Sequence, residues 1–300
     1  MMDKVFLVFN TACFGDVLLC NTLCQNIKLN YPDAKVVFIT DKPFASVAEF
    51  QKDVDEVIVY DKRGEHKGFG GMLKFIKDFP YKKPYCSFLT YWNVRNYMVS
   101  LAIGAKHIIS ENKKNPEPSA QKQHADLLGK IGVAQIENLP IRYFPPDADV
   151  SVKAKTIAFC PVSKDISKDM SVETAVNLLD ILKKSGYEVL FCGAGEKSVN
   201  YAKELKDLGA EFIDLTNKTT IPELGYVLKN SAALVSVDTG TMHLGCAVNA
   251  KTVVVFYKPE MTARWAPNPE IYSNTRLIKN NQSAENIYQI LCQLLEDKDV

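Results

Sequence analysis

The chain has 300 residues, of which 47% are hydrophobic and 24% are charged, and its formal net charge is +1. This length and composition indicate a globular protein with room for two domains. The small net charge gives no reason to expect a nucleic acid as partner, and no apolar run approaches the roughly 20 residues of a membrane span.

Short β-branched runs alternate with segments of helical periodicity, and this alternation occurs twice. It is typical of parallel sheets with helices on both faces. In the first half we expect strands near 4–9, 35–40, 57–60, 86–90 and 106–109, and helices near 16–31, 43–51, 70–79, 93–103 and 119–132. In the second half we expect strands near 155–160, 187–192, 211–215, 232–237 and 252–257, and helices near 171–185, 196–208, 221–230 and 240–249.

The two halves are joined by the sequence Tyr-Phe-Pro-Pro-Asp-Ala-Asp at 143–149, which is rich in turn formers and suits a linker. We expect an N-terminal domain over 1–146 and a C-terminal domain over 147–300, with a ligand cleft between them. A last helix is predicted near 283–297, and the sequence leaves open whether it packs back on the N-terminal domain.

Eight cysteines are present, but none forms a C-x-x-C pair and several lie in apolar strands or helix faces. This usage favours reduced, buried thiols in a cytosolic protein. No His/Cys cluster has the spacing of metal ligands, and no metal is expected. The first residues lack the basic region and continuous apolar core of a signal peptide.

The segment 232–244 is a strand of buried character that runs directly into a helix start. Unpaired amides and the macrodipole at such a start hold an anion, and Gly240 lets a phosphate approach closely. Open α/β sheets also bind ligands at the carboxyl ends of their strands. The alternative is that Asp238 or Thr239 simply caps the helix.

The first half has a similar strand-to-helix junction at 10–19. Gly15 permits a tight turn there, and Asp16 lies at the predicted start of the helix. Asp16 is either an N-cap or a carboxylate that takes a proton from an acceptor hydroxyl. Farther along, Arg95 is either an ordinary surface arginine or a contact for an anionic acceptor.

Two sets of motifs resemble a known family. Asp-Thr-Gly-x-x-His-Leu at 238–244, followed by Phe-Tyr-Lys-Pro at 256–259 and Arg-Trp-x-Pro at 264–267, resembles the C-terminal signature of the family 9 glycosyltransferases, the lipopolysaccharide heptosyltransferases. Gly-Asp-Val-Leu-Leu at 15–19 and Tyr-Pro-Asp-Ala at 31–34 are similar to the N-terminal signature of this family. The resemblance covers nearly the whole chain in the same order.

The resemblance implies a GT-B architecture of two Rossmann-like domains whose parallel sheets face each other across a cleft. It implies an inverting, metal-independent transfer of a heptose or related sugar from an ADP-sugar, with no cofactor besides this donor. The acceptor would be a lipid-linked oligosaccharide of the lipopolysaccharide or lipooligosaccharide core. The protein would be cytoplasmic, or peripheral at the inner face of the inner membrane.

The resemblance also implies residue roles. Asp16 falls on the catalytic base of the family, and Gly15 lies beside it on the acceptor side. The donor-binding residues would be Lys168, Glu196, Thr219, Asp238, Thr239, Gly240, Thr241 and His243. Each has a structural alternative: Lys168 can be a solvated lysine, Glu196 an acid that offsets a helix dipole, and His243 a packing residue.

The sequence departs from the family around the donor pocket, where Met170 replaces a common tryptophan, Tyr257-Lys258-Pro259 replaces a Phe-Gly-Pro turn, and Thr219 replaces a hydrophobic residue. ADP-heptose is therefore expected, with another nucleotide sugar left open. A non-hydrolysing nucleotide-sugar epimerase of similar fold and a non-catalytic nucleotide-sugar-binding protein remain as alternatives. An NAD-dependent dehydrogenase is disfavoured, because Gly193-Ala194-Gly195 lacks the third glycine of the dinucleotide fingerprint.

Overall fold

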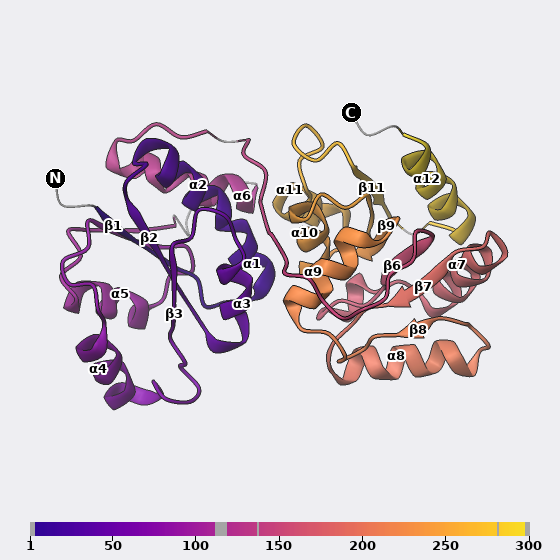
Figure 1. Ribbon diagram of the computed structural model, residues 1–300, viewed down its shortest axis with the longest axis horizontal. Helices are drawn as coiled ribbons and strands as arrows, with labels where there is room; N and C mark the ends of the chain where they lie inside the picture. Colours follow the sequence, from indigo (N-terminus) through magenta and orange to yellow (C-terminus); the bar gives the residue numbers. More distant parts are fainter. Residues whose placement is uncertain (1–3, 112–118, 137, 281, 298–300) are drawn as a thin grey trace. The chain divides into compact units, whose positions relative to one another are not determined.

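The structure is a computed structural model that describes residues 4–111, 119–136, 138–280 and 282–297. The chain divides into two compact units, Met1–Arg142 and Tyr143–Val300. The first unit contains a five-stranded sheet and the second a six-stranded sheet, and helices pack on both (Figure 1). Neighbouring strands are parallel throughout both sheets, which confirms the predicted α/β class.

The first sheet has the strand order β3-β2-β1-β4-β5. Its central strand β1 is apolar on both faces, and Phe6, Leu7, Val8 and Phe9 are all fully buried. The chain leaves β1 toward β2 on one side and later returns to β4 on the other. We call such a place a switch point, and open sheets bind ligands there. The strands are β1 (Val5–Phe9), β2 (Lys35–Thr40), β3 (Glu56–Val59), β4 (Cys86–Leu89) and β5 (His107–Ser110).

Helices α4 (Gly68–Asp78) and α5 (Val94–Ala102) pack on one face of this sheet, with Phe75 and Val99 in its apolar core. The remaining helices of the first unit are α1 (Phe14–Leu19), α2 (Asn21–Asn30), α3 (Ala45–Glu49) and α6 (Ala120–Asp126). The sequence predicts one helix over 16–31, but the structure has two, which meet at Cys20.

Helix α2 buries polar side chains as well as apolar ones. The amides of Gln25 and Asn26 donate to the carbonyls of Pro140 and Ile136 at 2.6 and 3.0 Å. These bonds fix the otherwise irregular segment that follows α6. A buried amide is stable only when it is paired in this way, so α2 positions the last part of the first unit.

The second sheet has the order β11-β10-β9-β6-β7-β8, with its switch point between β6 and β9. Its strands are β6 (Thr156–Cys160), β7 (Glu188–Phe191), β8 (Ile213–Asp214), β9 (Ala233–Val237), β10 (Thr252–Phe256) and β11 (Thr275–Lys279). The sequence analysis does not predict β11. This strand lies at the sheet edge, where Arg276 and Lys279 interrupt the apolar pattern that marks buried strands.

Helices α7 (Val172–Lys184), α8 (Gly195–Asp207) and α12 (Ala284–Glu296) share one apolar core with the sheet. The last helix, α12, packs on α7 and contributes Ile287, Leu291 and Leu294 to this core. Helices α9 (Ile221–Asn230) and α10 (Gly240–Ala247) pack against each other, and α11 (Thr262–Trp265) is a single turn. None of the helices in the described ranges is both long and apolar enough to cross a bilayer.

The segment that begins the second unit is anchored to it. Tyr143 is 2% exposed, and its backbone N–H donates to the carbonyl of Ala247 at 3.1 Å. A β-carbon at Gly225 would lie 3.0 Å from the Tyr143 ring and 3.2 Å from Pro145. The absence of a side chain at Gly225 therefore lets this segment lie directly on α9.

Candidate active site

The switch point of the second sheet brings together two charged residues that are far apart in sequence. Lys168 ends a short 3-10 helix, η3 (Ile166–Lys168), in the connection after β6, and Asp238 directly follows the adjacent strand β9. The Lys168 Nζ and Asp238 Oδ2 atoms are 2.7 Å apart, and both side chains are mostly buried. Lys168 is therefore not a freely solvated lysine, and each charge depends on the other.

Helix α10 begins at Gly240, two residues after Asp238. Its N-cap residue Thr239 has extended backbone angles but makes no capping hydrogen bond. Thr239 thus occupies the N-cap position but does not cap the helix through its side chain. The amides of Gly240 and Thr241 stand at the positive end of the helix dipole, which leaves them available to an anionic ligand.

The position of this helix start is set by close packing. A β-carbon at Gly245 would lie 2.7 Å from Leu234 Cδ2 and 3.0 Å from Thr252 Oγ1, so α10 sits tightly on β9 and β10. His243 is buried in the same helix. Burial and the nearby Lys168 ammonium lower the pKa of His243 to about 4, so its imidazole is neutral at pH 7.

The loop that carries Lys168 is held by residues that the sequence analysis does not single out. The Asp165 carboxylate accepts from the backbone N–H and hydroxyl of Ser167 at 3.1 and 2.6 Å. Its other oxygen lies 3.0 Å from the Lys258 ammonium, in the connection after β10. These hydrogen bonds, the Ser167 hydroxyl first and then Lys258, hold the pKa of Asp165 below its usual range. An Asp two residues before a Ser is a local capping signal that sequence inspection can detect.

Two other predicted donor residues follow neighbouring strands of the same sheet. Glu196 is exposed in the first turn of α8, after β7. Thr219 is half-buried between β8 and α9, and Thr220 next to it, rather than Thr219, caps α9 through a capping box with Glu223. All predicted donor residues thus come after the carboxyl ends of β6, β7, β8 and β9. Met170, which replaces a family tryptophan, is 1% exposed and belongs to the apolar core.

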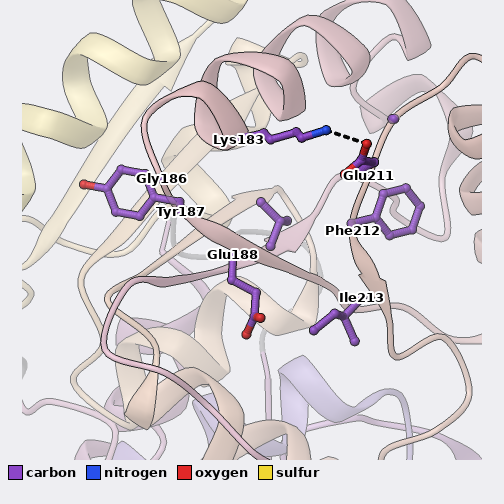
Figure 2. A pocket seen from close by; sticks show the side chains of 9 residues that line it. Lys183, Gly186, Tyr187, Glu188, Glu211, Phe212 and Ile213 are labelled. Carbon is purple, nitrogen blue, oxygen red and sulfur yellow. Dashed lines mark ion pairs between the residues drawn. The ribbon is translucent and has the colours of Figure 1, made fainter.

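A surface depression of the second unit lies away from these residues (Figure 2). Its lining comes from the amino ends of β7 and β8, including Tyr187, Glu188 and Phe212, and Lys183 of α7 forms an ion pair with Glu211 at its rim. Lys168 and Asp238 follow the opposite, carboxyl ends of the strands. The depression is therefore distinct from the candidate donor site.

In the first unit, Asp16 lies in the first turn of α1, close to the switch point between β1 and β4. The N-cap is Cys13, so the interpretation of Asp16 as the cap is wrong. The Asp16 side chain is half-buried, and its Oδ2 accepts a hydrogen bond from the Cys13 thiol at 2.9 Å. Desolvation of the sulfur and the Asp16 carboxylate raise the pKa of Cys13 to about 11, which keeps this thiol protonated as a donor.

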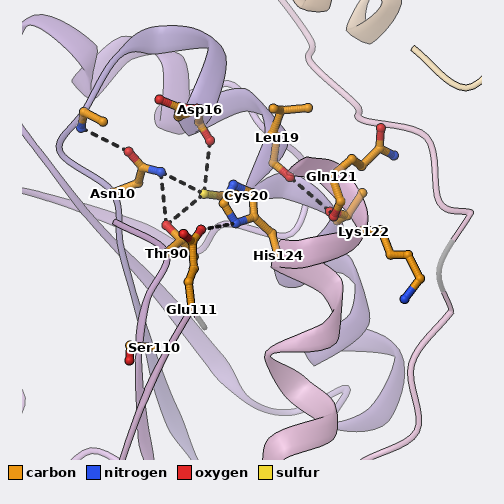
Figure 3. A network of polar contacts seen from close by, with 12 residues as sticks. Asn10, Asp16, Leu19, Cys20, Thr90, Ser110, Glu111, Gln121, Lys122 and His124 are labelled. Atoms are coloured by element: carbon orange, nitrogen blue, oxygen red, sulfur yellow. Dashed lines mark hydrogen bonds and ion pairs between the residues drawn. The ribbon is translucent and has the colours of Figure 1, made fainter. Parts of the chain in front are cut away.

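A buried polar network fixes the backbone beneath Asp16 (Figure 3). The Asn10 amide, at the end of β1, donates to Thr90 Oγ1 at 3.1 Å and to the Cys20 sulfur at 3.4 Å. The Cys20 thiol in turn donates to the Asp16 carbonyl at 3.1 Å. The network therefore links the ends of β1 and β4 to the turn that carries the candidate base.

The other two residues that the sequence analysis predicts on the acceptor side have structural environments that the sequence does not reveal. Gly15 lies inside α1 with an ordinary helical backbone, so it makes no tight turn. Arg95 bonds the Tyr60 hydroxyl and the carbonyls of His66 and Gly68, and thereby holds the loop after β3. In that loop Lys62 donates to Thr11 Oγ1 at 2.7 Å, and burial lowers the pKa of its ammonium.

His124 of α6 is buried against this network, with its Nδ1 atom 3.3 Å from Glu111 Oε1. Burial favours the neutral ring, but Cys20 and Glu111 outweigh it and raise the pKa of His124 to about 10. The His124 imidazole forms a buried ion pair with Glu111 when its ring is protonated. Neither residue was assigned a role from the sequence.

Because the folded-state pKa of His124 lies above its unfolded value, its contribution to stability is complete below about pH 6.5 and is lost as the pH rises through about 10. We expect Glu111→Gln to lower the free energy of unfolding by about 2 kcal/mol at pH 6 and by less at pH 10. Urea unfolding of both proteins at the two pH values measures this difference. An equal loss at both would contradict the ion pair.

The described residues contain no group of three or more His, Cys, Asp or Glu side chains that could hold a metal ion. The eight cysteines are free, and six of them are buried.

Comparison with known proteins identifies the family. The model of glycosyltransferase family 9, described as heptosyltransferase, matches residues 105–291, more than half of the chain. The chain belongs to glycosyltransferase family 9. It is therefore a glycosyltransferase, as the motifs at 15–19 and 238–244 predict, and this family assignment disfavours the epimerase and the purely binding alternatives.

The relatives of this family 9 glycosyltransferase agree in fold. It is 21% identical over 279 residues to lipopolysaccharide heptosyltransferase 3 of Escherichia coli (strain K12), covering 81% of this chain and 79% of that protein. A family 9 glycosyltransferase from Veillonella parvula is similar with a TM-score of 0.81 and 16% identity, over 98% of each chain. E. coli heptosyltransferase WaaC with ADP is similar with a TM-score of 0.76 and 16% identity, over 97% of this chain and all of that one. These structures confirm the two-domain GT-B fold.

Proposed function

We propose that this enzyme transfers a heptose from ADP-heptose to an oligosaccharide of the lipopolysaccharide core. The observation that carries the proposal is the buried Lys168–Asp238 pair beside the start of α10, whose N-cap side chain makes no hydrogen bond. A cation next to free helix amides suits the binding of a diphosphate. The names of the relatives supply the chemistry: one is a lipopolysaccharide heptosyltransferase, and another is a heptosyltransferase solved with ADP.

On the donor side, departure of ADP from the sugar develops negative charge on the leaving phosphate. The Lys168 ammonium and the amides of Gly240 and Thr241 would stabilise this charge without a metal ion. Asp238 holds the ammonium 2.7 Å away and would accept hydrogen bonds from the hydroxyls of the transferred sugar. His243, neutral because of burial, would donate to the donor without adding charge.

On the acceptor side, Asp16 would act as the general base that takes the proton of the attacking hydroxyl. The Cys13 hydrogen bond and the network around Cys20 hold it in place. Attack from the face opposite to the departing ADP would invert the anomeric configuration. Lys62, the half-buried cation near Thr11, would contact an anionic group of the core oligosaccharide.

A thermal-shift assay with several nucleotide sugars identifies the donor. ADP-heptose at 100 times its dissociation constant should stabilise the protein by about 2.7 kcal/mol, or roughly 5–10 °C in melting temperature. UDP-N-acetylglucosamine and GDP-mannose, at the same concentration, should produce a much smaller shift. A larger shift with either control would show that the donor has been wrongly assigned.

Turnover separates the remaining alternatives. A transferase releases ADP only when acceptor is present, whereas an epimerase converts its nucleotide sugar without any acceptor. A non-catalytic protein binds the donor and releases nothing. Chromatography of the nucleotide pool, with and without core oligosaccharide, distinguishes these three results.

A further inference from the structure

Helix α5 exposes an apolar stripe to solvent. Val94, Tyr97, Met98 and Leu101 are spaced one and two helical turns apart, and their exposed fractions are 63, 41, 44 and 55%. Residues three, four and seven apart lie on one side of a helix, so these four side chains form a continuous face. A soluble helix normally turns such a stripe toward the core.

The opposite side of α5 is locked inward, so the stripe cannot rotate into the core. Val99 is fully buried in the apolar core, together with Ile103 just beyond the helix. Between them, the buried Ser100 hydroxyl lies 2.7 Å from the hydroxyl of Ser87 on β4. The helix thus buries a serine and exposes a methionine and a leucine, which is the reverse of what core formation alone would favour.

Helix α4 extends this surface. It packs against α5 on the same face of the first sheet (Figure 1), and it exposes Phe69 and Leu73, four residues apart, by 71 and 49%. We call the exposed apolar residues of α4 and α5 the α4–α5 face. Contiguous exposed apolar patches of this kind mark binding surfaces.

The charge around the α4–α5 face is strongly one-sided. Residues 61–106 contain nine lysines and arginines but three aspartates and glutamates, in a chain whose total net charge is +1. Exposed lysines lie on α4 at Lys77, and near the carboxyl end of α5 at Lys83 and Lys106, whereas Lys74 of α4 pairs with Glu65 at 2.8 Å. An apolar helix face bordered by lysines, with a tyrosine among them, is complementary to an anionic lipid bilayer.

We propose that the α4–α5 face docks the enzyme on an anionic membrane surface. This inference rests on the proposed function, because a lipid-linked acceptor lies in such a surface. The exposed Tyr91 before α5 directly follows Thr90, which bonds Asn10 at the switch point of the first sheet. The start of α5 therefore lies near the polar network that holds the backbone of Asp16. An acceptor anchored in the bilayer has to reach this place.

The proposal is tested with the full chain and vesicles of phosphatidylglycerol and phosphatidylethanolamine. We expect sedimentation with these vesicles, weakening as salt rises from about 0.1 to 0.5 M, and none with phosphatidylcholine vesicles. Met98→Ser with Leu101→Ser should reduce the vesicle affinity at least tenfold. Each lysine near an anionic surface contributes roughly fivefold to the affinity. Lys77→Gln with Lys106→Gln should therefore reduce the vesicle affinity by about 25-fold.

Matched controls carry the same changes elsewhere. Leu208→Ser removes an equally exposed leucine of the second unit, at 58%, and Lys229→Gln removes an exposed lysine there. Both should bind vesicles like the wild type. If the α4–α5 variants bind vesicles as tightly as the wild type, the proposal is overturned. It is also overturned if sedimentation velocity shows that the wild type is a dimer and that Met98→Ser with Leu101→Ser makes it a monomer.

Transfer to a soluble, lipid-free acceptor separates this proposal from the proposed function. The α4–α5 variants should keep wild-type turnover there, since none of the substituted residues belongs to the candidate active site. If the wild type transfers no sugar but binds vesicles through this face, the proposed function fails and the docking surface stands. If transfer proceeds and the variants bind vesicles like the wild type, the docking surface alone fails.

Discussion

Asp16→Asn is expected to lower the rate of sugar transfer by a factor of about 100 or more, because loss of a general base typically costs 100 to 10,000-fold. The asparagine keeps the size of the side chain and can still accept from the Cys13 thiol, so the local structure should persist. The affinity for ADP, measured by calorimetry, should stay within a factor of two, since the candidate donor residues all belong to the other unit.

Asp33→Asn is the matched control. It removes an exposed carboxylate of the same unit, in the turn before β2, and should transfer at the wild-type rate. If Asp16→Asn retains more than a tenth of the activity, the base is another residue.

The alternation of the two kinds of segment was enough to predict two parallel sheets and the helices between them. Local pattern works here because strands such as β1 and β9 are buried on both faces and therefore continuously apolar. The local pattern did not predict β11, because charged residues interrupt the apolar run of this edge strand. It also predicted one helix over 16–31 where the structure has two helices that meet at Cys20. The difference at Cys20 involves side-chain contacts to β1 and β4, which no local window contains.

In the candidate site too, local features could be predicted from the sequence and contacts between distant residues could not. Asp16 and Asp238 were singled out at predicted strand-to-helix junctions, and Lys168 only through the resemblance to the family. The sequence did not predict that Lys168 and Asp238 form an ion pair, because they are 70 residues apart and meet only when β6 and β9 become neighbours. The ion pair of His124 with Glu111 was missed because α6 and the end of β5 meet only in the folded unit.

The second large effect is expected at the Lys168–Asp238 pair. Lys168→Ala should reduce transfer by about 100 to 1,000-fold, the usual loss when one group that stabilises developing negative charge is removed. It should also destabilise the second unit by about 3 kcal/mol, because it leaves the carboxylate of Asp238 buried without its partner. Lys164→Ala, an exposed lysine in the same loop, should show neither effect.

The double variant Lys168→Ala with Asp238→Ala separates folding from donor binding. Removing both charges also removes the unpaired carboxylate, so urea unfolding should show that most of the lost stability returns. The affinity for ADP should not return, because the ammonium that we propose to face the diphosphate is still missing. If the double variant binds ADP like the wild type, the pair only supports the fold, and the positive charge for the leaving group must come from elsewhere around α10.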